Sequence, residues 1–327
     1  MFKKKYVIED KVNKGFLVEA GEILLQATSY LKKIDICTGD TIVESKLNSG
    51  LNIQKIEKSN DYYIGLASGK IVFFDCHLKL KEEKTIRYVG YHLYDQKYLV
   101  KILDYDYTTF KGKYSVFDLL SGNDLWEIDT GEMIKVDSNI AFTASSKEVG
   151  KRDFATGESE WTYEIDNENF VPELIGVFKD LVFFGLQKKD KLIALDLATG
   201  ALKWERKSFP SLNRLDQEKG VIHSISNGYC KLNASTGEEV DTFIDQEYFK
   251  GEGVFSQRNN YAIDGDHLIT TDYKKGVIGS FNTVTHKFDW LHEEKGVSFP
   301  APSPIIYQAP YLLVHDNKGT LHIFEKE

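Results

Sequence analysis

The stretch "LIALDLATGALKW", residues 192–204, decides the fold because close copies of it recur along the chain. An apolar run ends at Asp196, the pair Thr199–Gly200 follows, and Trp204 lies on the returning segment. We call the Asp, Asn or Glu that ends each apolar run the lead residue of its repeat. Self-similarity at a fixed period indicates a solenoid, a propeller or an array of repeats.

Eight lead residues run from one end of the chain to the other, at a mean spacing of about 41 residues. They are Asp35, Asp75, Asp118, Asp153, Asp196, Asn233, Asn282 and Glu325. Each of the four tryptophans lies eight residues after a lead residue, at positions 126, 161, 204 and 290. The copy at Asp75 has lost its Thr-Gly pair, and the copy at Glu325 stops after its strand.

The local chemistry of the repeat predicts a tight hairpin. An Asp or Asn side chain accepts hydrogen bonds from backbone N–H groups of its own turn, and a Thr or Ser hydroxyl adds another. Gly adopts the positive φ that tight hairpins require. The tryptophan then supplies a large ring to bury on the returning strand.

Each repeat also contains two earlier apolar runs, as in "LVFFGL" at 181–186, which indicates a strand buried on both faces. Four strands per repeat and eight repeats predict an all-β, eight-bladed β-propeller of four-stranded antiparallel blades, with residues 1–327 forming one domain. Because the last repeat ends early, we predict that the N-terminal strand "KKKYVIED" completes it beside residues 318–326. A seven-bladed propeller is the alternative, if the copy at Asp75 merges with a neighbour.

The unit "LIALDLATGALKW" resembles the repeat of the pyrroloquinoline-quinone-like (quinoprotein dehydrogenase-like) propellers, over nearly the whole chain. That superfamily contains quinoprotein alcohol dehydrogenases and a bacterial outer-membrane assembly lipoprotein. Members that bind the quinone carry an adjacent Cys-Cys pair, a stacking Trp and a calcium set. This chain has no adjacent cysteines, and all its tryptophans occupy the repeat position, so the resemblance implies a member without the cofactor.

Composition favours a soluble protein in a reducing compartment. The net charge of −9 argues against nucleic-acid binding, which requires a basic patch. The three cysteines form no C-x-x-C pair, so we expect reduced thiols. The start, "MFKKKYVIEDK", has no apolar run behind its basic residues, and no stretch approaches the length of a membrane helix. We therefore predict a cytoplasmic bacterial protein with no signal peptide and no membrane span.

Motifs for chemistry are absent from the sequence. It contains no G-x-S-x-G, no G-x-x-x-x-G-K and no H-E-x-x-H. The pairs in "DYDY" (104–107) and "DGDH" (264–267) lack the further ligands of a calcium loop. We predict no catalytic residues, no metal site and no cofactor.

The connections between strands define two sides of each blade. The turn side carries the turns that begin at lead residues. The loop side carries the connections from second to third strand and from blade to blade. Several loop-side connections are long, at 103–113, 166–173, 243–261 and 294–304, and some of them combine acidic with aromatic residues. Such loops on a rigid scaffold suit a protein interface. The predicted partner-binding residues are Asp104, Tyr105, Asp106, Tyr107, Phe110, Glu168, Phe170, Asp245, Glu247, Tyr248 and Phe249.

These features predict a non-catalytic scaffold that binds a protein partner with a basic surface, since opposite charge speeds encounter. A narrower hypothesis is a bacterial toxin-neutralising, immunity-type protein. The alternative is an enzyme or small-ligand-binding propeller with a pocket at the axis of the blades.

Overall fold

The lead residue of each repeat folds its turn as the sequence predicts. Asp196 Oδ1 accepts hydrogen bonds from the backbone N–H of Ala198 (3.1 Å) and of Thr199 (2.9 Å) and from the Thr199 hydroxyl (2.9 Å). Gly200, at φ +71°, donates its N–H to the Asp196 carbonyl. The same turn forms in other blades, and Asn233 and Asn282 accept the corresponding N–H groups through Oδ1.

Repetition of this hairpin gives an all-β, eight-bladed β-propeller of four-stranded antiparallel sheets, so the eight-blade prediction is confirmed. The copy at Asp75 forms its own sheet, and the seven-blade alternative is therefore wrong. The structure, a computed structural model, describes residues 1–9, 16–27, 29–48, 51, 53–59, 62–67, 69–86, 90–94, 98–106, 111–119, 121–129, 133–137, 140–167, 170–186, 190–207, 213–225, 228–251, 254, 261–272, 275–300 and 305–327.

The chain divides into two compact units, one formed by Met1–Ile86 with Phe243–Glu327 and the other by Arg87–Thr242. We call them the terminal unit and the central unit. In the central unit, blade 3 is β10 (Gly90–Tyr94), β11 (Tyr98–Asp106), β12 (Lys111–Asp118) and β13 (Asp124–Asp129); blade 4 is β14 (Met133–Asp137), β15 (Ile140–Ala144), β16 (Glu148–Arg152) and β17 (Ser159–Glu164); blade 5 is β18 (Glu173–Phe178), β19 (Leu181–Leu186), β20 (Lys191–Asp196) and β21 (Leu202–Lys207); blade 6 is β22 (Asn213–Asp216), β23 (Val221–Ile225), β24 (Tyr229–Asn233) and β25 (Glu239–Phe243).

The terminal unit holds the other four blades. Blade 7 is β26 (Tyr261–Asp264), β27 (His267–Asp272), β28 (Val277–Asn282) and β29 (Lys287–Glu293); blade 8 is β30 (Ile305–Gln308), β31 (Tyr311–His315), β32 (Leu321–Lys326) and β1 (Phe2–Ile8); blade 1 is β2 (Phe16–Glu19), β3 (Glu22–Gln26), β4 (Tyr30–Asp35) and β5 (Thr41–Lys46); blade 2 is β6 (Ile53–Ser59), β7 (Tyr62–Ala67), β8 (Lys70–Phe74) and β9 (Leu80–Thr85). The helix α1 (Gln246–Gly251) precedes blade 7.

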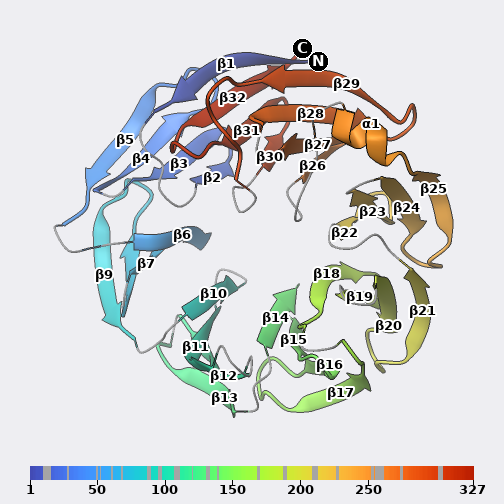
Figure 1. Cartoon of the computed structure of the whole chain (residues 1–327). Coiled ribbons are helices and arrows are strands. Elements are labelled where there is room, and N and C mark those ends of the chain that lie inside the picture. The colour runs from blue at the N-terminus through green and yellow to red at the C-terminus, as the bar shows by residue number, and fades with distance from the viewer. Residues whose placement is uncertain are drawn as a thin grey trace. The chain divides into compact units, whose positions relative to one another are not determined.

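The N-terminal strand closes blade 8, as predicted. β1 pairs antiparallel with β32, from Phe2↔Lys326 to Ile8↔Leu321. Figure 1 shows both chain ends at this point, where β1 lies beside β32. The Glu327 N–H donates to the Met1 carbonyl at 2.9 Å. The two ends of the sequence therefore build one blade.

Tryptophans join consecutive blades of the central unit. The Nε1–H of Trp126, Trp161 and Trp204 each donates to the carbonyl that follows the next lead residue, at 2.8, 3.0 and 3.2 Å. Each ring covers the glycine of that next turn, and a Cβ added at Gly200 would lie 2.7 Å from the Trp161 ring. The repeat spacing therefore encodes contacts between blades as well as the hairpins within them.

The apolar core consists of clusters between neighbouring blades. One cluster contains Leu195 of blade 5 with Phe142 and Trp161 of blade 4. Strand β19 is buried along its whole length, as its continuous apolar run predicts. This packing gives each blade a rigid base from which its turns and loops project.

Candidate partner-binding surface

The hairpin of β11 and β12 places two carboxylates at the surface. Asp104 and Asp106 are exposed, and Tyr105 between them is half-buried. A register shift lies between Ile102 and Asp104. The Tyr105 ring lies so close to Gly112 that a Cβ there would be 2.9 Å from it. Tyr105 therefore packs on its own hairpin, while Asp104 and Asp106 face solvent.

Two further predicted residues of this hairpin, Tyr107 and Phe110, lie outside the described residues. The same holds for Glu168 in the next long connection.

The connection after β17 presents an aromatic ring. Asn167 is completely buried, and its Nδ2 donates to the Phe170 carbonyl at 2.8 Å. Its backbone N–H donates to the Ser146 carbonyl at 2.9 Å, which ties this connection to the second-to-third-strand turn of the same blade. Phe170 is 44% exposed. Buried Asn167 thus fixes a loop that holds an apolar ring in solvent.

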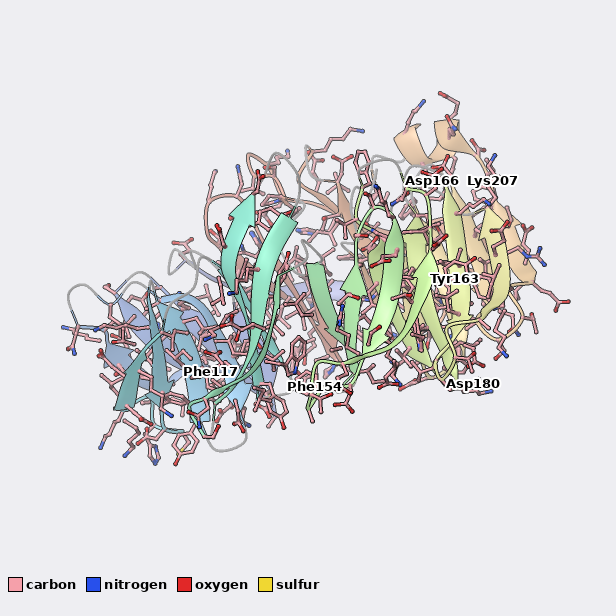
Figure 2. All side chains as sticks on the ribbon, turned by 90° about the horizontal axis from the view of Figure 1, so that it is seen from below. Phe117, Phe154, Tyr163, Asp166, Asp180 and Lys207 are labelled. Atoms are coloured by element: carbon pink, nitrogen blue, oxygen red, sulfur yellow. The ribbon has the colours of Figure 1, made fainter. Side chains whose placement is uncertain are left out.

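Figure 2 separates the two sides of the central unit. Asp166 and Lys207 lie at one end of the blades, and Asp180 and Phe154 lie at the other. Asp180 belongs to the turn side, because its carbonyl accepts the N–H of Leu197 beside the Asp196 turn. The loop carrying Phe170 therefore lies on the loop side, as predicted.

The segment before blade 7 differs from its prediction. Asp245 lies just before α1, and its Oδ1 accepts the Tyr248 N–H at 2.9 Å. Asp245 and Glu247 are exposed, whereas Phe249 is completely buried. Its ring packs on that of Phe281 (5.3 Å), just before the lead residue of blade 7, and on that of Phe288 (5.9 Å) in β29.

Tyr248 also faces inward, since its hydroxyl accepts the Phe288 N–H at 2.8 Å. Both rings hold the helix on blade 7, Tyr248 while half-buried, and we correct the prediction for Phe249, which offers no surface. In the sequence Tyr248 and Phe249 follow Asp245 and Glu247, and these acidic neighbours gave no indication that Phe249 is buried and Tyr248 half-buried.

The exposed predicted residues belong to both units. Asp104, Asp106 and Phe170 are exposed in the central unit, and Asp245 and Glu247 are exposed in the terminal unit. Asp104 and Asp106 lie at the end of β11, opposite Lys113 and Lys111 of β12, and Asp245 and Glu247 lie at the start of α1.

Lead carboxylates on the turn side are engaged in their own hairpins. Hydrogen bonds from Lys203 and Thr199 lower the pKa of Asp196 to about 2. The Thr156 N–H lowers the pKa of Asp153, and the Thr38 N–H lowers that of Asp35. These contacts explain the repeated acidic residues without a catalytic role.

The described residues contain no group of three or more His, Cys, Asp or Glu side chains arranged to hold a metal ion. In "DGDH" (264–267), one of the two carboxylate pairs considered as a calcium loop, Asp264 forms an ion pair with Lys326 at 2.6 Å. The three cysteines are free thiols. None of the helices in the described part of the chain is long and apolar enough to span a membrane.

Solved structures share this fold at low sequence identity. BamB from Moraxella catarrhalis is 13% identical, with a TM-score of 0.68, and the match covers 99% of this chain and 100% of that one. A europium-containing methanol dehydrogenase is 9% identical, with a TM-score of 0.70 and coverage of 99% and 93%. The computationally designed protein Ika8 is 13% identical, with a TM-score of 0.65 and coverage of 95% of each chain.

No curated protein matches the sequence. A family model does match, over residues 111–326, which is about two thirds of the chain. That model is described as outer membrane protein assembly factor BamB. With the eight four-stranded blades, this match confirms the predicted pyrroloquinoline-quinone-like superfamily, and the chain belongs to the family of outer membrane protein assembly factor BamB.

Proposed function

We propose that the protein is a scaffold that binds a protein partner through loop-side residues. The observation that carries this proposal is the exposure of Phe170 on a loop fixed by buried Asn167. Apolar rings held in solvent by a rigid scaffold are the anchors that protein interfaces use. Membership of a family named for an assembly factor supports the same class of function.

The partner presents a basic surface to these loops. Asp104, Asp106, Asp245 and Glu247 are exposed carboxylates, and the chain carries a net charge of −9. Opposite charges accelerate encounter and select among partners. This attraction weakens with salt, because exposed charges are screened at ionic strengths near 0.15 M, where the Debye length is about 8 Å.

A photo-crosslinking residue at position 170 tests the proposal in the native host. Val284 is 71% exposed in the turn led by Asn282, so the same residue at position 284 is the matched control on the turn side. We expect one crosslinked protein at 170, identified by mass spectrometry, whose contact peptide is basic. Its yield should fall with added salt and in the variant D104K/D106K. Failure to crosslink at 170, or the same product at both positions, would contradict the proposal.

A narrower form of this proposal is that the partner is a toxin that the protein neutralises. The motivation is a chain with an acidic surface and no recognised catalytic motif. In this case the purified protein should abolish the activity of the crosslinked partner at equimolar concentration. A partner whose activity is unchanged rejects the neutralising role and leaves the scaffold proposal in place.

A further inference from the structure

The residue just before each lead residue can be compared across the eight blades. This position faces the preceding blade, as Leu195 does in its cluster with Phe142 and Trp161. In seven blades it holds a buried apolar side chain: Ile34, Phe74, Phe117, Leu195, Leu232, Phe281 and Phe324. Blade 4 has Arg152 there instead. Departures from an otherwise consistent pattern are expected at functional or strained sites.

Arg152 lines a groove between blades 3 and 4. Its Nη1 donates to the Gly157 carbonyl at 3.1 Å, which directs the side chain towards its own turn. The groove has a volume of about 500 Å³ and is lined by residues of both blades. It lies by the turn side, because Asp118 and Asp153, the lead residues of the two blades, are part of its wall.

One part of the groove is aromatic and aliphatic. The rings of Tyr98 from blade 3 and Phe154 from blade 4 have centroids 4.7 Å apart. Leu125, which is 39% exposed, and Ile140 add aliphatic surface. Flat or extended apolar groups fit such a wall.

The remaining wall is charged and carries a net negative charge. Three carboxylates, from Asp118, Asp153 and Glu160, face two cations, Lys151 and Arg152, which leaves one negative charge. Lys151 and Glu160 form an ion pair at 2.7 Å. Hydrogen bonds from Thr156 keep the pKa of Asp153 below its usual value, so this carboxylate stays charged at neutral pH.

We propose that this groove binds an arginine side chain of a partner protein. A guanidinium group stacks on aromatic rings and pairs with carboxylate oxygens through charge-assisted hydrogen bonds, while its aliphatic stem covers apolar surface. Tyr98 and Phe154 supply the rings, Asp118 and Asp153 the carboxylates, and Leu125 the aliphatic contact. A lysine lacks the planar group that stacks on the rings. This site is separate from the loop-side residues, so either proposal can fail alone.

The test is a titration of the full-length protein with N-acetylarginine amide, followed by the indole N–H signals in a ¹H–¹⁵N spectrum. The Trp126 Nε1–H donates to the carbonyl of Phe154, a groove residue, and the Trp204 Nε1–H donates to Ala234 in another pair of blades. We expect a saturable shift of the Trp126 signal and a constant Trp204 signal. N-acetylcitrulline amide, the neutral isostere, should bind more weakly.

Variants locate the site with matched controls. Asn233 and Asn282 lead the same turn in other blades, so Asp118→Asn and Asp153→Asn keep the hairpin. Both should weaken arginine binding, whereas Asp196→Asn, the same change in blade 5, should not.

Several results would overturn the arginine site. They are a non-saturable or equal shift of the two tryptophan signals, and equal effects of D118N and D196N on arginine binding.

Discussion

The two units join their blades in different ways. In the central unit each of the three contacts between consecutive blades is a tryptophan covering a turn glycine and donating to the carbonyl beside it. In the terminal unit each contact differs. Trp290 packs on Phe2 and Phe324 between blades 7 and 8, at centroid distances of 5.2 and 5.7 Å.

Tyr6 of β1 takes the role of tryptophan between blades 8 and 1. Its hydroxyl donates to the Ile36 carbonyl at 2.7 Å, and its ring lies 3.2 Å from a Cβ built at Gly39. Between blades 1 and 2 the large and the small residue change places. Small Val43 occupies the tryptophan position of blade 1, and it packs in a cluster with buried Leu78 from the turn led by Asp75. The contact between neighbouring blades therefore requires that the side chain at the tryptophan position and the residue in the next turn have complementary volumes. A tryptophan over a glycine is one way to meet this requirement.

The largest difference should appear on truncating the two kinds of contact. Trp161 is 93% buried, so Trp161→Ala removes a large ring and should cost about 3–5 kcal/mol of unfolding free energy. Val43→Ala should cost about 1 kcal/mol, because it deletes little buried area. Urea unfolding followed by far-UV circular dichroism measures both. Equal losses would show that the tryptophan contact has no special weight.

Exchanging the volumes sharpens the comparison. Leu78→Gly alone should cost less than the ~2–5 kcal/mol of a core truncation, because glycine relieves the positive φ of residue 78, +58°. Val43→Trp alone should destabilise the protein by about 1–3 kcal/mol through overpacking. The double variant should lose less than the sum of the two, since the ring then has a glycine to cover. A strictly additive loss in thermal or urea unfolding would argue against exchange of volume at this contact.

Tyr6→Phe isolates the polar part of the contact. It keeps the ring against Gly39 and removes the donor to Ile36, so we expect a loss of about 1 kcal/mol. Burial raises the pKa of the Tyr6 hydroxyl to about 12, so a titration of tyrosine absorbance should lose one high-pH group in this variant. Loss of a group that titrates near pH 10 instead would place the hydroxyl in solvent.

The smallest expected effect is the pH dependence of the turns. The folded pKa of Asp196 is about 2, below the unfolded value of about 3.9. Its contribution to stability is therefore full above pH 4 and is lost as the pH falls towards 2. Asp196→Asn should flatten this acid limb of the melting temperature slightly. An unchanged limb in D196N would assign the acid sensitivity to other carboxylates.

The sequence predicted whatever the repeat encodes locally. The lead residue, its Thr-Gly pair and the tryptophan lie close together in the chain, so spacing alone located the hairpins, and the early end of the last repeat indicated closure by β1. The exchange of Val43 with Leu78 was missed, because it links residues of two blades that no single repeat contains.

The candidate site was predicted less well than the fold, for the same reason. Phe249 was expected at the surface because its neighbours are acidic, but it packs on Phe281, about thirty residues later in the chain. Arg152 was also missed, although its signal is present in the sequence: alignment of the repeats places it among seven apolar residues.

A double-variant cycle between Trp161 and Gly200 tests most directly whether the repeat encodes the contact between blades. Gly200→Ala introduces a Cβ 2.7 Å from the Trp161 ring and an unfavourable positive φ. The backbone penalty is the same with Trp161 or with Trp161→Leu, so the cycle isolates the contact. We predict that Gly200→Ala costs at least about 1 kcal/mol more with Trp161 than with Leu at that position. If Gly200→Ala lowers the free energy of unfolding equally with Trp161 and with Leu at that position, the proposed contact between blades 4 and 5 is contradicted.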